Sequence, residues 1–462
     1  MKIILKALDK NTVSNSLNFY ENQIDIEESK LLAKFFCQNT TITSLKLNYN
    51  RLGSGGVKAL AYALYKNTTL TTLDLSDNYL KSEGIITLAN ALCKNITLTS
   101  LNLESNKLGS EAGKALANAL CKNSTLKNLN LAENNLELEG GKALASALCV
   151  NTALTSLNLE DNNLGSEVGK AMADALCNNN SLTFLNLQNN NIELNGGFAL
   201  VGALCKNNTI KNLDLQDDNL RGVKTIINAL CKKTTRNYLD FHSNVLGLDE
   251  LKILVDALYR ITTPTSLVIC DNKLGLEGGK ILIDSLYKIT TLTSLNLDNN
   301  KLGSDGGKAL SYVLCKNTTL TSLSLESNEF GLEGGKALAN VLYTNSSLKD
   351  LNLNNNNLES EGGKSLASAL CANTTLTSLK LAKNNLGIEG GKALADALYK
   401  NTTLTALDLG VNYLRLEGGK ALAYALCKNT TLSFLNIDSN ELGSEGGKAF
   451  AIALCTNSTL KN

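Results

Sequence analysis

The sequence predicts an α/β solenoid, a curved horseshoe with a parallel β-sheet on its concave face and α-helices on its convex face. Three observations predict this fold class. A pattern of 28 residues recurs along almost all of the 462-residue chain. In the first half of each copy the apolar residues alternate as in a strand, and in the second half they recur with the period of a helix. Stacked copies of this kind bury one continuous core between a sheet and a row of helices.

The pattern divides the chain into one repeat array with a partial copy at each end. Sixteen repeats occupy residues 14–459, and all have 28 residues except the one that starts at Ile210, which has 26. Residues 1–13 match the helical half of a preceding repeat, so we expect them to form a partial repeat that caps the first strand. Residues 460–462 are the start of a truncated repeat.

The first half of each repeat has the form LxxLxLxxNxL. In the repeat that starts at Leu126, Leu129 and Leu131 are two residues apart and therefore point to the same face of a short strand. The ninth residue, Asn134 in this repeat, is Asn in 15 of the 16 repeats. We expect its amide to satisfy backbone groups in the turn of its own repeat and of the next one.

The second half of each repeat predicts a helix. Leu144 and Leu148 are four residues apart, which gives the helix one apolar side. Glu139 stands near the helix start, where a negative charge suits the helix dipole. The Gly140–Gly141 pair is expected to let the helix begin close to the strand. Each repeat is therefore a strand, a loop, a helix and a second loop.

The LxxLxLxxNxL segment followed by a helix in a 28-residue period resembles the leucine-rich repeat superfamily, and within it the ribonuclease-inhibitor-like class. Repeats of this class also occur in the ligand-sensing ends of NOD-like receptors and in Ran GTPase-activating proteins. The resemblance implies a scaffold that binds another protein through its concave sheet and the adjoining loops. Two alternatives stay open: a regulator of a small GTPase, similar to the Ran GTPase activators, or the ligand-sensing repeat region of an NOD-like receptor.

The composition excludes several other function classes. Lys and Arg number 44 and Asp and Glu 43, which excludes a strongly basic nucleic-acid binder. The chain has a single His, so we expect no metal site, no catalytic residues and no cofactor. It has no readable signal peptide and no window near 18 consecutive apolar residues. We therefore expect a cytoplasmic protein with no membrane segment and no enzyme activity, and the oligomeric state stays open.

The cysteines follow the repeat. Eleven of the 12 occupy one repeat position, and the other five repeats carry Tyr there. Since Tyr cannot replace a metal-binding or catalytic thiolate, this mixture predicts a packing role at that position. Cys270 is the exception and is expected on the outward face of its strand.

Charge is distributed unevenly between the two predicted faces. The 48 outward positions on the strands and directly after them hold 15 acidic and three basic residues, a charge of about −12. Thirteen repeats carry Lys at their seventeenth residue, which predicts a basic outer rim on the helices. A concave acidic face favours a basic protein partner and disfavours nucleic acid on that face, because phosphates would be repelled.

Two places on the concave face are the best candidates for partner binding. Glu104, Glu133, Glu160 and Asp161 are expected to act as one patch. The repeat is most irregular between Ile210 and Pro264, where Tyr238 and His242 are expected to face outward beside acidic residues. The candidate partner-binding residues are Glu104, Glu133, Glu160, Asp161, Asp214, Asp217, Tyr238, Asp240, His242, Asp271, Asp298 and Glu326.

Overall fold

The computed structural model describes most of the chain as two compact units, residues 1–233 and residues 234–462. The described residues are 15–215, 220–231, 238–243, 246–261, 264–286 and 289–460. The predicted capping segment, residues 1–13, lies outside them, as do residues 461 and 462 of the predicted truncated repeat.

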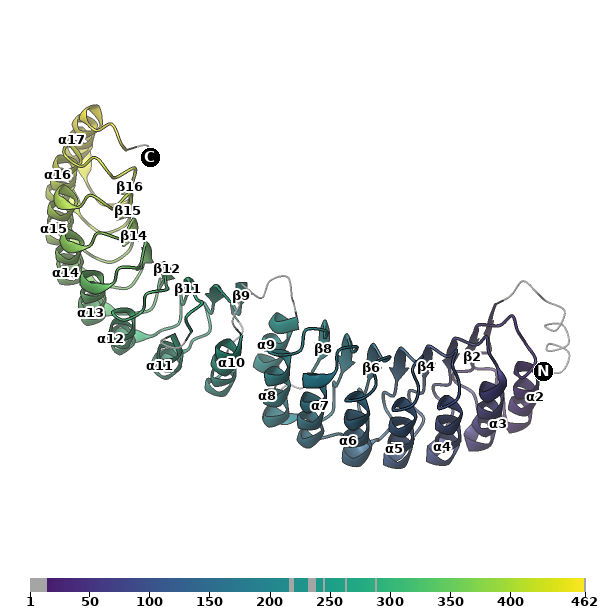
Figure 1. Ribbon diagram of the computed structural model, residues 1–462. Helices are drawn as coiled ribbons and strands as arrows, with labels where there is room; N and C mark the ends of the chain where they lie inside the picture. Colours follow the sequence, from purple (N-terminus) through teal and green to yellow (C-terminus); the bar gives the residue numbers. More distant parts are fainter. Residues whose placement is uncertain are drawn as a thin grey trace. The chain divides into compact units, whose positions relative to one another are not determined.

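Each repeat supplies one strand and one helix, as the two periods predict. Within each unit the strands lie along the inner face and the helices along the outer face (Figure 1). The described elements of the first unit are β1 (Ser16–Asn18), α2 (Ile26–Phe36), β2 (Ser44–Lys46), α3 (Gly53–Lys66), β3 (Thr72–Asp74), α4 (Lys81–Leu92), β4 (Ser100–Asn102), α5 (Gly109–Leu120), β5 (Asn128–Asn130), α6 (Glu137–Leu148), β6 (Ser156–Asn158), α7 (Ser166–Asn178), β7 (Phe184–Asn186), α8 (Glu193–Leu204), β8 (Asn212–Asp214) and α9 (Arg221–Cys231).

The second unit has the same order of elements. Its described elements are β9 (Tyr238–Asp240), α10 (Leu248–Arg260), β10 (Ser266–Val268), α11 (Gly275–Leu286), β11 (Ser294–Asn296), α12 (Gly303–Leu314), β12 (Ser322–Ser324), α13 (Gly331–Thr344), β13 (Asp350–Asn352), α14 (Glu359–Ala372), β14 (Ser378–Lys380), α15 (Gly387–Lys400), β15 (Ala406–Asp408), α16 (Arg415–Leu426), β16 (Phe434–Asn436) and α17 (Gly443–Thr456).

The strands form two parallel sheets of eight, β1 to β8 and β9 to β16, where the sequence predicts one sheet. Within a sheet, paired residues are 28 positions apart, as Leu101 and Leu129 are. The change from one sheet to the other falls at the 26-residue repeat, which sets Leu213 and Leu239 only 26 positions apart. The constant spacing that keeps successive strands in register is lost there.

The predicted core is confirmed. Leu129 and Leu131 are buried between the sheet and the helices, and so are Leu144 and Leu148 on the inner side of α6. None of the helices in the described ranges has both the length and the apolar character needed to traverse a lipid bilayer.

The regularly spaced Asn residues at the ninth position form a buried ladder of hydrogen bonds. Their side chains bond to the preceding repeat, whereas the sequence predicts bonds to the next one. Asn134 Nδ2 donates to the carbonyls of Leu131 (3.1 Å) and Ala132 (2.8 Å) in its own repeat and to Leu103 (2.9 Å) in the preceding repeat. Its Oδ1 accepts the backbone N–H of Asn106, also in the preceding repeat, at 2.9 Å. Backbone N–H groups in the turns after the strands donate to carbonyls of the following repeat. The Asn side chains add hydrogen bonds to the preceding repeat.

A second Asn ladder runs along the ends of the helices, and the sequence analysis missed it. Asn151 Nδ2 donates to the carbonyls of Leu120 (2.7 Å) and Asn123 (3.0 Å) in the preceding repeat. Thirteen of the sixteen repeats carry Asn at this twenty-sixth position, a signal as periodic as the first ladder. The exceptions are consecutive: the 26-residue repeat and the two after it, which carry the buried Ile261 and Ile289.

The Gly pairs lie inside the helices rather than at their starts, so the predicted reason for them is wrong. A Cβ on Gly113 of α5 would lie 2.8 Å from Cα of Gly140 in α6, and a Cβ on Gly141 would lie 2.8 Å from a methyl group of Val168 in α7. These glycines let neighbouring helices approach each other closely.

We expect Gly113→Ala to destabilise the protein by about 1–3 kcal/mol, because the new methyl group collides with backbone. Gly202→Ala in α8 has no atom within 4 Å of the added Cβ and is expected to stabilise by about 0.5–1 kcal/mol through the higher helix propensity of Ala. Urea unfolding of both variants measures the difference. Equal shifts of the same sign would contradict the packing role of Gly113.

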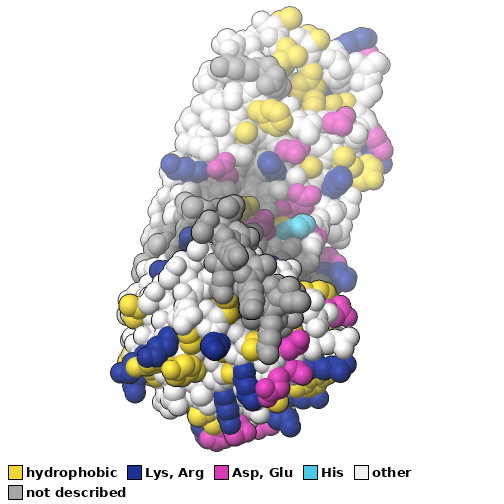
Figure 2. All heavy atoms as spheres, turned by 90° about the vertical axis from the view of Figure 1, so that its right-hand side faces the viewer, with side chains coloured by type: hydrophobic (Ala, Val, Ile, Leu, Met, Phe, Trp, Pro, Cys, Tyr) yellow, Lys and Arg dark blue, Asp and Glu magenta, His cyan; other side chains and the backbone are white. Residues whose placement is uncertain are grey.

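The predicted basic rim is instead a row of ion pairs. In the described helices, eleven of the seventeenth-position lysines pair with the acidic residue three positions earlier, as in Lys114–Glu111 (3.0 Å) and Lys364–Glu361 (2.7 Å). Figure 2 shows dark-blue Lys and Arg side chains next to magenta Asp and Glu side chains at the end nearest the viewer. Because each positive charge has a nearby negative one, this outer row offers little net attraction to an anion.

Candidate functional site

The predicted partner-binding residues lie on the strands and in the turns that follow them. Glu104 comes just after β4 and Glu133 just after β5, while Asp214 ends β8 and Asp240 ends β9. Asp217 lies outside the described residues. Asp214 belongs to the first unit, and the candidates from Tyr238 onward belong to the second unit.

Four carboxylates of the first unit influence one another, and we call them the acidic cluster: Asp74, Asp77, Glu104 and Glu133. Burial is the main cause that raises the pKa of Glu104, and the charges of Glu133, Asp77 and Asp74 raise it further. Burial likewise raises the pKa of Asp77, with added repulsion from Glu133 and Asp74. A cation that approaches carboxylates with raised pKa values favours their charged form.

Exposed tyrosines lie beside the acidic cluster, and the sequence analysis missed them. The charge of Asp77 is the main cause of the raised pKa of Tyr49. The Tyr20 and Tyr49 rings meet edge to face with centroids 5.3 Å apart. Lys107 Nζ lies 5.4 Å from the centroid of Tyr79. The missed signal is that these aromatics recur in the turns of the first three repeats, whereas the sequence analysis weighed aromatics on the strands.

A hollow of about 580 Å³ opens beside these turns. Tyr49 and Tyr79, 52% and 59% exposed, line it together with Asp77 and Glu133. Arg51 and Lys107 also line the hollow, whereas Asp74 and Glu104 of the acidic cluster do not. Two members of the acidic cluster and two tyrosines therefore border a space large enough for a side chain of a partner.

Several predicted acidic residues also link neighbouring repeats. Asn130 Nδ2 donates to Glu104 Oε2 at 2.8 Å, and the same kind of bond joins Asn186 to Glu160 (3.1 Å). Glu133 accepts instead from Ser105 Oγ, at 2.7 Å. Each carboxylate keeps further lone pairs that a partner could use. The face is therefore partly structural and still open to a ligand.

The sequence predicts one patch that consists of Glu104, Glu133, Glu160 and Asp161. The structure groups Glu104 and Glu133 with Asp74 and Asp77, which both belong to the repeat that starts at Leu70. A common patch that includes Glu160 and Asp161 stays a prediction.

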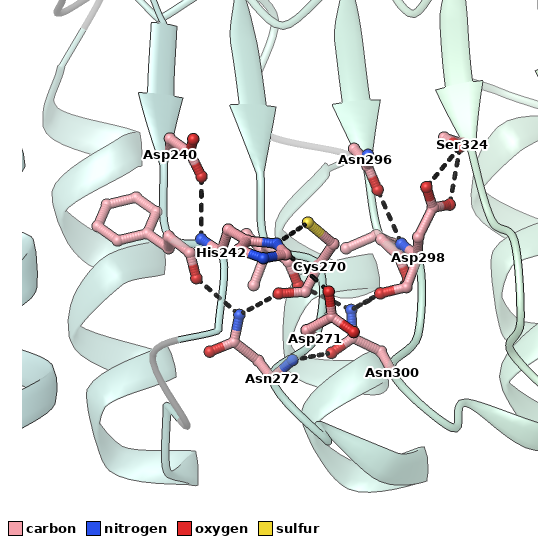
Figure 3. A network of polar contacts seen from close by, with 12 residues as sticks. Asp240, His242, Cys270, Asp271, Asn272, Asn296, Asp298, Asn300 and Ser324 are labelled. Carbon is pink, nitrogen blue, oxygen red and sulfur yellow. Dashed lines mark hydrogen bonds and ion pairs between the residues drawn. The ribbon is translucent and has the colours of Figure 1, made fainter.

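In the second unit the structure brings together three predicted residues and one that was not predicted. His242 Nδ1 lies 2.8 Å from Cys270 Sγ and 3.3 Å from Asp271 Oδ2 (Figure 3). Asp240 Oδ1 accepts the backbone N–H of His242 at 2.9 Å. Burial and then the charge of Asp271 raise the pKa of Cys270. Cys270 was expected on the outward face of its strand, and its side chain is only 8% exposed.

The remaining candidates of the second unit lie on the same face. Ser324 Oγ and the backbone N–H of Glu326 each donate to Asp298 Oδ1 at 2.7 Å. Burial is the main cause that raises the pKa of Asp298, and these hydrogen bonds oppose it. Glu326 accepts from Asn352 Nδ2 at 3.1 Å, and the Tyr238 side chain is exposed on β9.

The packing role predicted for the other cysteines is wrong at the five positions where the side chain is exposed. Among the eleven that end the helices, Cys231 is buried, whereas Cys121 and Cys149 are exposed. The thiol of Cys205 lies 3.3 Å from the Val201 carbonyl and that of Cys427 lies 3.5 Å from the Ala423 carbonyl. At a helix C-terminus a thiol can donate to a last-turn carbonyl, which is a local role rather than core packing.

Comparison with known proteins identifies the repeat. A family model described as Leucine Rich repeat matches twelve segments of 24 residues, which together exceed half of the chain. No curated protein matches the chain. The matched residues are 38–61, 66–89, 94–117, 122–145, 150–173, 178–201, 288–311, 316–339, 344–367, 372–395, 400–423 and 428–451.

Solved structures resemble the chain only loosely. Leiomodin-1 actin-binding site 2 has 26% identity over 27% of this chain and 75% of its own, with a TM-score of 0.26. The tropomodulin C-terminal domain of Caenorhabditis elegans has 16% identity over 33% of this chain and 95% of its own, with a TM-score of 0.30. A chain of the yeast Rad7 and Elc1 complex has 16% identity over 90% of this chain and 83% of its own, with a TM-score of 0.31.

These matches do not distinguish the ribonuclease-inhibitor-like class, the NOD-like receptors or the Ran GTPase activators, which stay predictions. Proteins built of such repeats are generally non-enzymatic scaffolds that bind other proteins. Since the family model covers more than half of the sequence and the described repeats share the strand–turn–helix order, the chain belongs to the leucine-rich repeat family.

Proposed function

We propose that this leucine-rich repeat protein is a non-enzymatic, cytoplasmic scaffold that captures a Lys- or Arg-rich segment of a protein partner on the acidic cluster. The hollow lined by Asp77, Glu133 and the exposed rings of Tyr49 and Tyr79 is the observation that carries the proposal. A cationic side chain near these carboxylates replaces repulsion with attraction.

The tyrosines support the same kind of partner. A cation gains energy over the face of an aromatic ring, and Lys107 of this chain already lies over the ring of Tyr79. Tyr49 places a second exposed ring at the same hollow, next to Asp77. Aromatic rings beside charged groups are typical of the residues that contribute most to binding. A nucleic acid would bring phosphates against the carboxylates and be repelled.

The test uses a fluorescent decalysine peptide as the probe. Its affinity for the full chain, measured by fluorescence anisotropy, is expected to fall at least about tenfold when the salt concentration rises from about 0.05 M to about 0.5 M, because the attraction between exposed charges is screened. A decaglutamate peptide, which has the same length and the opposite charge, serves as the control and is expected not to bind. Equal decalysine affinity at both salt concentrations would refute the proposal.

A further inference from the structure

Two residues of unusual type or position lie in the cluster around His242. His242 is the only His of the chain, and Cys270 is the only Cys that does not end a helix. The two are 28 positions apart and so occupy the same position in neighbouring repeats, next to β9 and β10. A spacing that looks remote along the chain therefore brings their side chains together. No metal site was expected because the chain has a single His, and that argument did not consider which Cys and Asp residues stacking would bring beside it.

The ligand atoms are already close enough for one ion. A nitrogen of His242, the sulfur of Cys270 and an oxygen of Asp271 all lie within 4.8 Å of one another. His242 Nδ1 is the central atom, 2.8 Å from the sulfur and 3.3 Å from the Asp271 oxygen. Ligands of a tetrahedral zinc ion lie about 2.0–2.3 Å from the metal, so the three atoms need to separate only slightly to admit it.

We propose that His242, Cys270 and Asp271 bind a zinc ion that joins these two neighbouring repeats. Imidazole, thiolate and carboxylate form a mixed set of ligands that suits Zn²⁺, whereas Mg²⁺ and Ca²⁺ prefer oxygen alone. A thiolate and a carboxylate together balance the two positive charges of the ion. The three side chains leave the fourth tetrahedral position to water.

The surroundings hold these ligands in place. Asp240 Oδ1 accepts the backbone N–H of His242, which orients the turn that carries the imidazole. Asn272 Nδ2 donates to the carbonyls of Cys270 (3.0 Å) and Phe241 (2.8 Å) and so links the two ligand-bearing turns (Figure 3). Partners of this kind, which orient the ligands without touching the metal, support metal affinity.

The position of the proposed ion, between two neighbouring repeats, indicates a structural role. The repeats that contain His242 and Cys270 are two of the three without the second Asn ladder, since Ile261 and Ile289 replace its Asn. The family model also finds no match between residues 201 and 288. A zinc ion here adds a link between neighbouring repeats where the side-chain amide bonds at the helix ends are missing.

The test measures zinc binding to the full chain after chelator treatment and dialysis under reducing conditions. Competition with a zinc-sensing dye gives the affinity, and Co²⁺ added in place of Zn²⁺ gives a visible absorption typical of tetrahedral thiolate coordination. We expect Cys270→Ser and His242→Asn to weaken zinc binding at least about a hundredfold and Asp271→Asn at least about tenfold. The cobalt absorption should disappear in Cys270→Ser.

Cys427→Ser is the matched control, because it removes a thiol at a helix end and leaves the cluster intact. It is expected to keep the zinc affinity and the cobalt absorption of the unchanged protein. Circular dichroism verifies that each variant is folded. The proposal is overturned if the unchanged protein does not bind zinc at micromolar concentration, or if folded Cys270→Ser binds zinc as tightly as the unchanged protein.

Discussion

Replacing Asp77, Glu104 and Glu133 together with Lys is expected to weaken decalysine binding at least about a hundredfold. The substitution turns three attractive charges of the acidic cluster into three repulsive ones. If each reversal changes the binding free energy by about 1 kcal/mol, a value typical of exposed charges in water, the sum is about 3 kcal/mol, or a factor of more than about 100. Fluorescence anisotropy at low salt measures the change.

The matched control reverses three carboxylates on the outer helices: Glu361, Glu389 and Glu417. It produces the same change in net charge at positions remote from the inner face, where the carboxylates pair with lysines. We expect it to lower the affinity less than about threefold, through the general change in charge. If the control loses as much affinity as the acidic-cluster variant, net charge accounts for binding and the acidic cluster is not the site.

Asn134→Ala is expected to destabilise the protein by about 3 kcal/mol or more. Asn134 is completely buried, and its amide contacts three carbonyls and one backbone N–H from two repeats. Alanine leaves these groups in the core without this partner, and each unsatisfied buried group costs about 1–3 kcal/mol. Denaturant unfolding measures the loss, and hydrogen exchange should show faster exchange of the Asn106 amide, whose acceptor is removed.

Asn128→Ala in the same repeat is the control. Asn128 lies on β5 with its side chain exposed, so the same substitution is expected to change stability by less than about 0.5 kcal/mol. The ladder would have no special importance for stability if both variants unfolded at the same denaturant concentration.

Local features of the repeat could be predicted because each depends on the spacing of a few residues. Leu129 and Leu131 mark a strand and Leu144 and Leu148 mark a helix wherever the repeat occurs, and the structure confirms both. The predictions failed mainly for features that depend on contacts with the neighbouring repeat. The glycines leave room for the next helix, and the Asn ladder bonds to the preceding repeat. The lysines of the outer row are a different case, because they pair with acidic residues of their own helix.

The candidate site shows the same division. The acidic character of the inner face follows from counting residues, but the choice of Asp74 and Asp77 as partners of Glu104 and Glu133 does not. The tyrosines of the first turns could have been found in the sequence, but the contact between the Tyr20 and Tyr49 rings could not. That contact and the contact of His242 with Cys270 each join residues from different repeats.

Periodicity alone was enough to establish the strand–helix repeat, its leucine core and its membership of a solenoid class, because these depend on contacts that recur identically in every repeat. Tertiary structure decided where one sheet gives way to a second, which carboxylates repel one another and which rare side chains meet. The physical reason is that these features arise from differences between neighbouring repeats. Side chains from two repeats interact only when stacking brings them within a few ångströms of each other.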